Sequence, residues 1–319
     1  MSAKAVVTGG AGFIGSTLVD RLLAEGWRVD VIDDLSSGNL SNLADARQTA
    51  ERRFSFTRLD IRSAAVTDHI KRQAPDIVFH LAAQADVRVS VVKPQFDAEV
   101  NVLGTLNVLE ACVASGVAKV VFAASGGTLY GTPTELPTRE AASWKPESPY
   151  GVSKKVTLDY LHYYREVQNL EYSALALANV YGPRQDPHGE AGVVAIFGGR
   201  LLAHQPVTIF GDGLQTRDFV YVDDVVDAFF RAADRGGGLL MNIGTGEQTS
   251  VNTLYETMAR LCNEKDLARH EDARVGEIRQ SALDPGRAEI HLGWKPWTPL
   301  EDGLARTLEH MKGQRAGAR

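Results

Sequence analysis

Residues 8–15 read Thr-Gly-Gly-Ala-Gly-Phe-Ile-Gly, and this stretch decides the fold of the chain. It follows a short apolar run and opens a segment with helical spacing of apolar residues. The three spaced glycines allow a sharp turn, a close approach of the main chain to a pyrophosphate, and tight packing of helix on strand. The N–H groups at the start of the helix would face the phosphates. The stretch predicts a dinucleotide site that includes Gly9, Gly12, Phe13, Ile14 and Gly15.

The first half of the chain alternates short β-rich apolar runs with longer segments of helical periodicity. The expected strands cover 5–8, 28–32, 54–58, 76–81, 120–124 and 172–177. The expected helices cover 12–25, 64–73, 101–115 and 150–168. This alternation predicts an α/β fold, with a doubly wound parallel Rossmann sheet and a smaller C-terminal α/β lobe for the substrate. We expect the sheet domain to span 1–178, with a return segment near 214–248, and the lobe to span mainly 179–319.

Acidic and small residues follow the next expected strands. Asp33 and Asp34 end the second strand, about 20 residues after the glycines, where an acid would bind the adenosine ribose hydroxyls. Two carboxylates would also repel the extra phosphate of NADP, so NAD is the expected cofactor. Asp60, followed by Ile61 after the third expected strand, could equally contact the adenine or cap a helix. After the fourth expected strand, the side chains of Leu81, Ala82 and Ala83 would let the cofactor lie flat across the strand ends.

The composition and charge of the chain argue against several classes of protein and kinds of site. The 319 residues are 44% hydrophobic and 23% charged, with a net charge of −6, which argues against a nucleic-acid binder. The two cysteines form no CxxC pair and have no His cluster nearby, so neither a metal site nor a disulfide is expected. No apolar run reaches the length that spans a membrane, and the first strand begins too early for a signal peptide. A cytoplasmic protein is predicted.

Tyr150 and Lys154 lie four residues apart, so both project from one face of the expected helix. A tyrosine with its ordinary pKa of about 10 is a poor base at neutral pH. A lysine ammonium one turn away and the positive nicotinamide of NAD would favour the phenolate and lower that pKa. In a chain that also carries the glycine fingerprint, the pair predicts catalysis rather than a solvated helix face.

Several motifs together resemble the extended short-chain dehydrogenase/reductases, and within them the UDP-glucose 4-epimerases. The resemblance extends from residue 5 to about residue 295. The Arg-Asp-Phe-Val-Tyr-Val-Asp-Asp stretch is specific to sugar-nucleotide members. The motifs are TGGAGFIG at 8–15, HLAA at 80–83, NVLGT from Asn101, SGGTLYG at 125–131, YGVSK at 150–154, NVYGPR at 179–184 and RDFVYVDD at 217–224.

The resemblance implies NAD-dependent inversion at C4 of a UDP-hexose, UDP-glucose or UDP-galactose. Tyr150 would take the proton of the sugar 4-hydroxyl while the C4 hydride passes to NAD. The 4-keto sugar would then turn over and take the hydride back on its other face, so NAD is retained. The family pattern also implies that Asn101 contacts the cofactor, that Asn179 contacts the diphosphate or the sugar, and that Arg217 binds the diphosphate. The remaining residues implied at the substrate are Val194, Phe210, Arg274 and Glu277.

The chain departs from the family at one catalytic position. The usual Ser or Thr, four residues before the tyrosine of the Tyr-Gly pair, is replaced by Gly126. Ser125 or Thr128 could supply the missing hydroxyl, as could a water molecule, and Thr128 is favoured over Ser125.

Alternatives remain for the sugar and for the reaction. The small Ser281 at the family's gate would admit an N-acetyl group, whereas Arg88 or Arg184 could pair with the carboxylate of a UDP-glucuronate. A dehydratase is disfavoured because Gly127 and Thr128 stand where it needs an acid pair. A net sugar-nucleotide dehydrogenase or reductase would use the same Tyr–Lys pair, whereas a non-catalytic NAD sensor would not need it. A homodimer through 101–115 and 150–168 is expected by resemblance.

Overall fold

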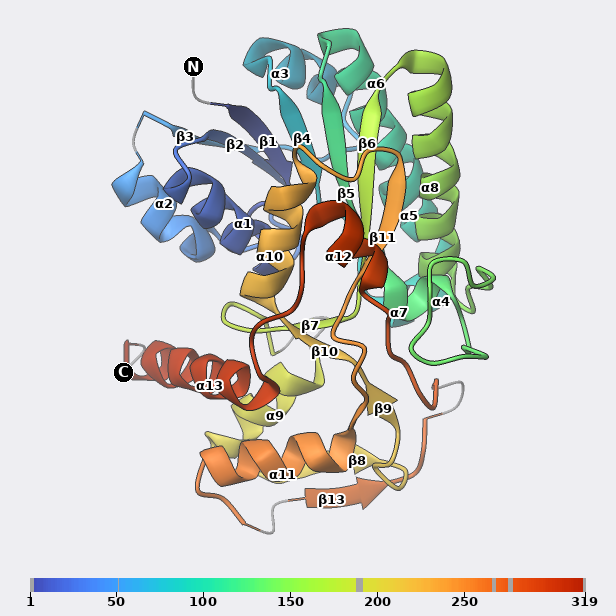
Figure 1. The fold of residues 1–319 in the computed structure, drawn as a ribbon. Coiled ribbons are helices and arrows are strands. Elements are labelled where there is room, and N and C mark those ends of the chain that lie inside the picture. Colours follow the sequence, from blue (N-terminus) through green and yellow to red (C-terminus); the bar gives the residue numbers. More distant parts are fainter. Residues whose placement is uncertain (1–2, 51, 188–191, 266–267, 275–277, 318–319) are drawn as a thin grey trace.

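A seven-stranded, fully parallel sheet forms the centre of the computed structural model (Figure 1). The structure describes residues 3–50, 52–187, 192–265, 268–274 and 278–317. The strand order is β11-β6-β5-β4-β1-β2-β3. From β1 the chain adds β2 and β3 on one side, then crosses over and adds β4, β5, β6 and β11 on the other side. The strands of this sheet are β1 (Lys4–Thr8), β2 (Arg28–Asp33), β3 (Phe54–Arg58), β4 (Ile77–His80), β5 (Lys119–Ser125), β6 (Glu171–Leu177) and β11 (Leu239–Ile243).

Helices cover both faces of this sheet. Within the described residues, no helix is both long enough and apolar enough to cross a membrane. The helices are α1 (Phe13–Ala24), η1 (Leu40–Leu43), α2 (Ala44–Thr49), α3 (Ala65–Gln73), α4 (Val87–Val92), α5 (Pro94–Ala98), the π-helical turn η2 (Glu99–Leu103), α6 (Gly104–Ser115), α7 (Gly126–Leu129), α8 (Pro149–Gln168), α9 (Val193–Leu201), α10 (Val222–Ala232), α11 (Val251–Leu261), α12 (Gly286–Leu292) and α13 (Leu300–Gly317).

Strand pleating divides the core into two clusters, one on each face of the sheet. Val7 of β1 and Phe79 of β4 pack with α1 and α10, whereas their neighbours Val6 and Val78 pack with α3 and α6. All four side chains are fully buried. Successive side chains of a strand point to opposite faces, and a strand covered on both sides therefore needs a continuous apolar run. This is the pattern that the sequence shows.

The predicted fold class is confirmed, and the strands expected in the first half all occur. Their bounds differ from the prediction by at most one residue at either end. The helix expected over 101–115 begins instead as η2, at Glu99, and continues as α6. Such π-helical turns insert a wider loop of main chain into a helix and are frequent at functional sites.

The second half adds three small two-stranded sheets below the main one (Figure 1). They pair β7 with β10, β9 with β12, and β8 with β13, and α9, α11 and α13 pack around them. Between these pieces the chain returns to the large sheet, where α10 packs on α1 and β11 pairs with β6. The additional strands are β7 (Asn179–Tyr181), β8 (Val207–Phe210), β9 (Thr216–Arg217), β10 (Phe219–Tyr221), β12 (Thr249–Ser250) and β13 (Ala268–Glu271).

Candidate active site

The glycine turn lies where the strand order reverses, between β1 and β4. In open parallel sheets, ligands bind at the carboxyl ends of strands at such a point. Gly9 has a φ of 70°, and a Cβ there would lie 2.7 Å from the main-chain nitrogen of Ala82. The glycine at 9 therefore lets the turn after β1 approach the segment after β4, which carries Leu81, Ala82 and Ala83. Leu81 N–H donates to the Thr8 carbonyl at 3.1 Å and fixes that approach.

The start of α1 has the features of a pyrophosphate site. Its N-cap, Gly12, has no side chain to cap the helix, and its first turn contains no acidic residue. The first N–H groups of the helix, among them those of Phe13 and Ile14, are thus available to an anion in the field of the helix dipole. These features fit the diphosphate of NAD.

Asp33 ends β2 beside this turn. Its carboxylate accepts hydrogen bonds from the N–H groups of Ala11 at 2.9 Å and Leu35 at 2.8 Å. Burial raises the pKa of Asp33, and the two N–H donors oppose that rise. A buried acceptor fixed by two main-chain donors suits ribose hydroxyls, which can donate to its remaining lone pairs. Asp34 accepts from Ser36 N–H at 2.8 Å.

Two predicted cofactor residues are engaged by protein groups. The Asp60 carboxylate binds the Arg62 guanidinium, with 2.6 Å between Oδ2 and Nη2, and this hydrogen bond holds the pKa of Asp60 below its usual range. Asn101 is buried in η2 and clamps the main chain of Gln84: Nδ2 donates to the Gln84 carbonyl at 2.8 Å, and Oδ1 accepts from its N–H at 2.9 Å. Ile61 is buried beneath α6.

The structure brings Tyr150 and Lys154 together on the first turns of α8. Ser148 caps this helix by accepting from the Gly151 N–H, and Pro149 occupies its first position, where a missing N–H costs nothing. Tyr150 is 9% exposed and Lys154 is 4% exposed, with the ammonium 5.6 Å from the Tyr150 ring centroid. Lys154 Nζ also donates to the Ala123 carbonyl at 3.0 Å, which holds it against β5.

A chain of buried hydrogen bonds crosses the sheet beside Lys154. Thr105 Oγ1 donates to the Asn101 carbonyl at 2.7 Å, so it must accept from His80 Nε2 at 2.9 Å. His80 Nδ1 is then an acceptor for the Thr8 hydroxyl, at 2.6 Å, and Thr8 accepts in turn from Ala82 N–H at 3.3 Å. The neutral Nε2–H tautomer of His80 satisfies every member of the chain.

We expect stability to depend on pH through this histidine. Burial, and secondly the charge of Lys154, lower the pKa of His80 to about 3, against about 6.5 in the unfolded chain. Between these values the unfolded chain binds the extra proton, so the free energy of unfolding falls with decreasing pH, by up to about 1.4 kcal/mol per unit from this group.

Urea unfolding of the wild type and of His80→Asn at several pH values from about 7 to about 4 measures the effect. The variant should be less stable at pH 7 but lose less stability on acidification. His162→Asn, on the exposed side of α8, should keep the wild-type slope. Equal slopes for the wild type and the His80 variant would show that this histidine is not the group that titrates.

At Gly126 another residue fills the space that a side chain would take. A Cβ at position 126 would lie 2.3 Å from Cδ1 of Leu283, which is buried, so Leu283 occupies the space of a side chain there. Nearby, Oγ1 of Thr128 is buried and has no hydrogen-bond partner among the described residues. A buried hydroxyl without a partner is costly and suggests a ligand partner. Ser125 ends β5 and stands at the N-cap of α7 without forming a cap.

Restoring the family's serine should therefore destabilise the chain. We expect Gly126→Ser to lower the free energy of unfolding by about 1–3 kcal/mol, because the new side chain overpacks against Leu283. Gly127→Ser is the matched control, since nothing lies within 4 Å of a Cβ at that position. Denaturant unfolding of both variants and of Gly126→Ser with Leu283→Ala checks this. The prediction is wrong if Gly126→Ser and Gly127→Ser lower the free energy of unfolding equally. It is also wrong if Leu283→Ala does not restore part of the stability that Gly126→Ser removes.

The predicted substrate residues lie mainly in the small sheets. Phe210 ends β8, and the Arg274 guanidinium lies over its ring at 3.9 Å from the centroid. Val194 is buried in the adjoining helix α9. Arg217 lies in β9, and Ser281 is next to it, because the Ser281 N–H donates to the Thr216 carbonyl at 3.2 Å. Glu277 lies outside the described residues.

A buried aspartate, Asp218, fixes the segment around Arg217. Its carboxylate accepts from the N–H groups of Thr245, Gly246 and Leu283, and from the Thr245 hydroxyl at 2.7 Å. It thereby joins β9 and β10 to the turn after β11 and to the segment that contacts Gly126. Asn179 begins β7, where its N–H donates to the Asp218 carbonyl at 2.9 Å.

Two predicted arginines form ion pairs with the protein. Arg88 is 2.7 Å from Asp86, and its side chain is 70% exposed. Arg184 has a φ of 72° and pairs with Asp20 of α1 at 2.6 Å. Its guanidinium thus lies against α1, so a substrate contact would require breaking this pair.

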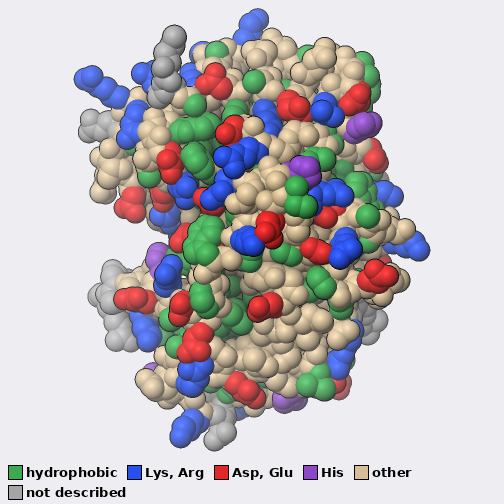
Figure 2. All heavy atoms as spheres, viewed as in Figure 1, with side chains coloured by type: hydrophobic (Ala, Val, Ile, Leu, Met, Phe, Trp, Pro, Cys, Tyr) green, Lys and Arg blue, Asp and Glu red, His purple; other side chains and the backbone are tan. Residues whose placement is uncertain are grey.

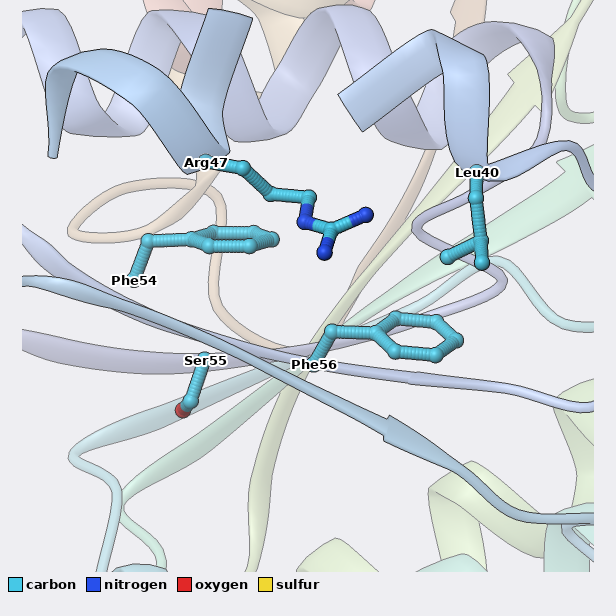
Figure 3. A pocket seen from close by; sticks show the side chains of 5 residues that line it. All are labelled: Leu40, Arg47, Phe54, Ser55 and Phe56. Atoms are coloured by element: carbon cyan, nitrogen blue, oxygen red, sulfur yellow. The ribbon is translucent and has the colours of Figure 1, made fainter. Parts of the chain in front are cut away.

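Two surface hollows lie apart from all these residues. One, of about 340 Å³, lies at the edge strand β3, where Arg47 extends beside Phe54 and Phe56 while Ser55 points away (Figure 3). The other, of about 380 Å³, lies around Trp27 and Phe230. None of the predicted site residues lines either hollow. On the face shown in Figure 2, acidic and basic side chains are interspersed, without a broad field of one sign.

Sequence reasoning missed the buried polar residues behind the site. Asp97 and Ser153 are both buried and bonded to each other, and neither was predicted to have a role. Ser153 lies between Tyr150 and Lys154, and Asp97 precedes Asn101 by one helical turn. That proximity to predicted residues is the only sign of them in the sequence.

Comparison with known proteins gives consistent matches. The model of the NAD dependent epimerase/dehydratase family matches residues 5–244. A UDP-glucose 4-epimerase from Mycolicibacterium smegmatis is 49% identical over 98% of this chain and 99% of its own. A Thermotoga maritima UDP-glucose 4-epimerase, solved with UDP-glucose, is 43% identical, with a TM-score of 0.94 and coverage of 98% and 99%. A Thermus thermophilus UDP-glucose 4-epimerase, in complex with NAD, is 40% identical, with a TM-score of 0.90 and coverage of 97% and 99%.

Proposed function

The chain belongs to the NAD dependent epimerase/dehydratase family, and on this premise we propose that it inverts the configuration at C4 of a UDP-hexose. It is an isomerase that interconverts UDP-glucose and UDP-galactose through a transient 4-keto sugar. The observation that carries this function is the buried Tyr150–Lys154 pair, in a chain whose glycine turn after β1 suits NAD.

NAD, when bound, accepts the hydride of C4 and returns it. The protein's own groups hold the cofactor and move the proton. The α1 N-terminus binds the diphosphate, and Asp33 binds the ribose. Tyr150 takes the proton of the 4-hydroxyl and later gives it back, and Lys154 stabilises its phenolate. We assign the second hydroxyl to Thr128 rather than Ser125, because Oγ1 of Thr128 is buried and unsatisfied.

The nucleotide end of the substrate is assigned to the lobe of small sheets. Phe210 and Arg274 form an aromatic and cationic surface for the uridine and its phosphates, and Arg217 offers a planar guanidinium to the diphosphate. We also assign Asn179 and Val194 to the site that binds this nucleotide end of the substrate. A sugar that must turn over requires a loose pocket, so the nucleotide contacts supply most of the binding energy.

Product analysis with UDP-galactose, with and without added NAD, tests the proposal. UDP-glucose should form without added cofactor and without net NADH. If NADH accumulates and no sugar is inverted, the protein is a net dehydrogenase.

The same assay with UDP-N-acetylgalactosamine and UDP-galacturonate ranks the sugars. We propose that Ser281 leaves room for an N-acetyl group beside C2, because its side chain is small and lies next to the β9 strand. Ser281→Tyr should then lower turnover of the N-acetyl sugar more than that of UDP-galactose. Unchanged turnover of the N-acetyl sugar would remove Ser281 as the gate.

We propose further that the protein is a homodimer through α8 and its neighbours. Val152, Tyr163 and Val167 on α8 are each 47–58% exposed, and Leu103, at the end of the adjoining η2, is 59% exposed. Exposed apolar side chains that share one helix face can pair with their own copy about a two-fold axis. Val167→Asp should shift sedimentation toward the monomer, whereas Ile290→Asp, at a site on α12 that is 79% exposed, should not. A wild-type monomer would refute the dimer.

A further inference from the structure

One carboxylate is buried behind the site and accepts hydrogen bonds from three different elements. Asp97 of α5 is 0% exposed. Its Oδ1 accepts from Gln84 Nε2 at 3.0 Å and from Asn101 Nδ2 at 2.9 Å. Its Oδ2 accepts from the hydroxyl of Ser153 at 2.6 Å. Hydrogen bonds to a carboxylate are stronger than those between neutral groups, so this junction is rigid.

The partners of Asp97 belong to the two halves of the reaction site. Ser153 belongs to α8, the helix of the catalytic pair. Gln84 belongs to the segment that follows β4 and begins with Leu81, and Asn101 clamps the main chain of Gln84 from both sides. Asp97 therefore connects the catalytic helix to the segment assigned to the cofactor.

The place of Ser153 on α8 makes this connection effective. It lies three residues after Tyr150 and directly before Lys154, so it is on the same side of the helix as Tyr150. A bond at Ser153 restricts rotation and sliding of the turn that carries both catalytic groups. Small displacements matter here, because an error of about 1 Å at the reacting atoms can cost on the order of 100-fold in rate.

We propose that Asp97 is a positioning residue of the epimerase, which acts through Ser153 on Tyr150 and through Gln84 and Asn101 on the cofactor segment. The inference rests on the proposed function. Asp97 itself is fully buried and bonded to these partners, and its role is to fix the geometry between the base and the cofactor.

Removal of one hydroxyl tests the catalytic side of the connection. Ser153→Ala should lower kcat for UDP-galactose by about 10-fold, with KM changed less than about 2-fold, since ground-state binding is untouched. Ser90→Ala is the matched control: it also removes a buried hydroxyl, but that hydroxyl donates to Val87 within α4. The two variants should show similar falls in Tm, and only Ser153→Ala should lose kcat.

Asp97→Asn tests the junction itself, because one oxygen then remains for three donors. We expect it to lower kcat at least as much as Ser153→Ala and to lower the amount of NAD that copurifies. Ser153→Ala should lower kcat less in the Asp97→Asn background than in the wild type, because the hydrogen bond that the two residues share is already lost.

The outcomes separate this inference from the proposed function. A wild type that does not invert UDP-galactose refutes the function, whereas NAD content still reports on Asp97→Asn. If Ser153→Ala folds and keeps the wild-type kcat, the positioning role is refuted. Full additivity of the two changes, or wild-type NAD content in Asp97→Asn, also overturns it.

Discussion

Tyr150→Phe should lower epimerase activity by about 100- to 10,000-fold, the range that a positioned acid–base group contributes. The loss should appear in kcat and in kcat/KM alike, because the hydroxyl acts in the transition state. Phenylalanine keeps the ring that packs at this position, so the fold should not change. Initial rates of UDP-glucose formation from UDP-galactose measure the effect.

The matched control is Tyr160→Phe on the same helix, where the tyrosine is 38% exposed. It should keep wild-type activity. Copurified NAD should be similar in the wild type and both variants. A loss of less than about tenfold in Tyr150→Phe would assign the proton transfer to another group.

Gly15→Ala should abolish cofactor retention. The new Cβ would lie 2.1 Å from the Gly9 carbonyl oxygen and 2.9 Å from Gly10 Cα. Both are main-chain atoms of the turn, so relief requires moving the turn or the start of α1. We expect the free energy of unfolding to fall by about 3 kcal/mol or more, and the copurified NAD to drop below roughly a tenth of the wild-type content.

Gly313→Ala provides the comparison in a helix without such a neighbour. A Cβ there meets nothing within 4 Å, and alanine favours helix over glycine by about 1 kcal/mol. That variant should keep its NAD and be as stable as the wild type or more so. Normal NAD content in a folded Gly15→Ala protein would show that the turn does not hold the cofactor as described.

The first half of the fold could be predicted because its patterns are long. The strands expected there have at least four residues each. The helices expected between them show apolar residues at i, i+3 and i+4 spacing. The small sheets gave no comparable pattern, since β9 and β12 have only two residues each. Their pairing is set by tertiary contacts, among them the hydrogen bonds that Asp218 accepts.

In the candidate site, too, some residues could be predicted from the sequence and others could not. Gly9, Tyr150 and Lys154 could be found because fixed local spacings carry their chemistry. Leu283 could not, because it reaches Gly126 only in the folded chain, across about half of the sequence. Asp97 was also missed, since a buried aspartate and an exposed one look alike in a sequence.

Deuterium transfer tests the central claim most directly. UDP-galactose that carries deuterium at C4 is converted in ordinary water, and the label at C4 of the UDP-glucose is measured by mass spectrometry and NMR. A hydride that leaves C4 and returns to its other face keeps the label, so the product should retain all of it. Loss of the label to water, or its loss with accumulation of an oxidised sugar, would contradict the account.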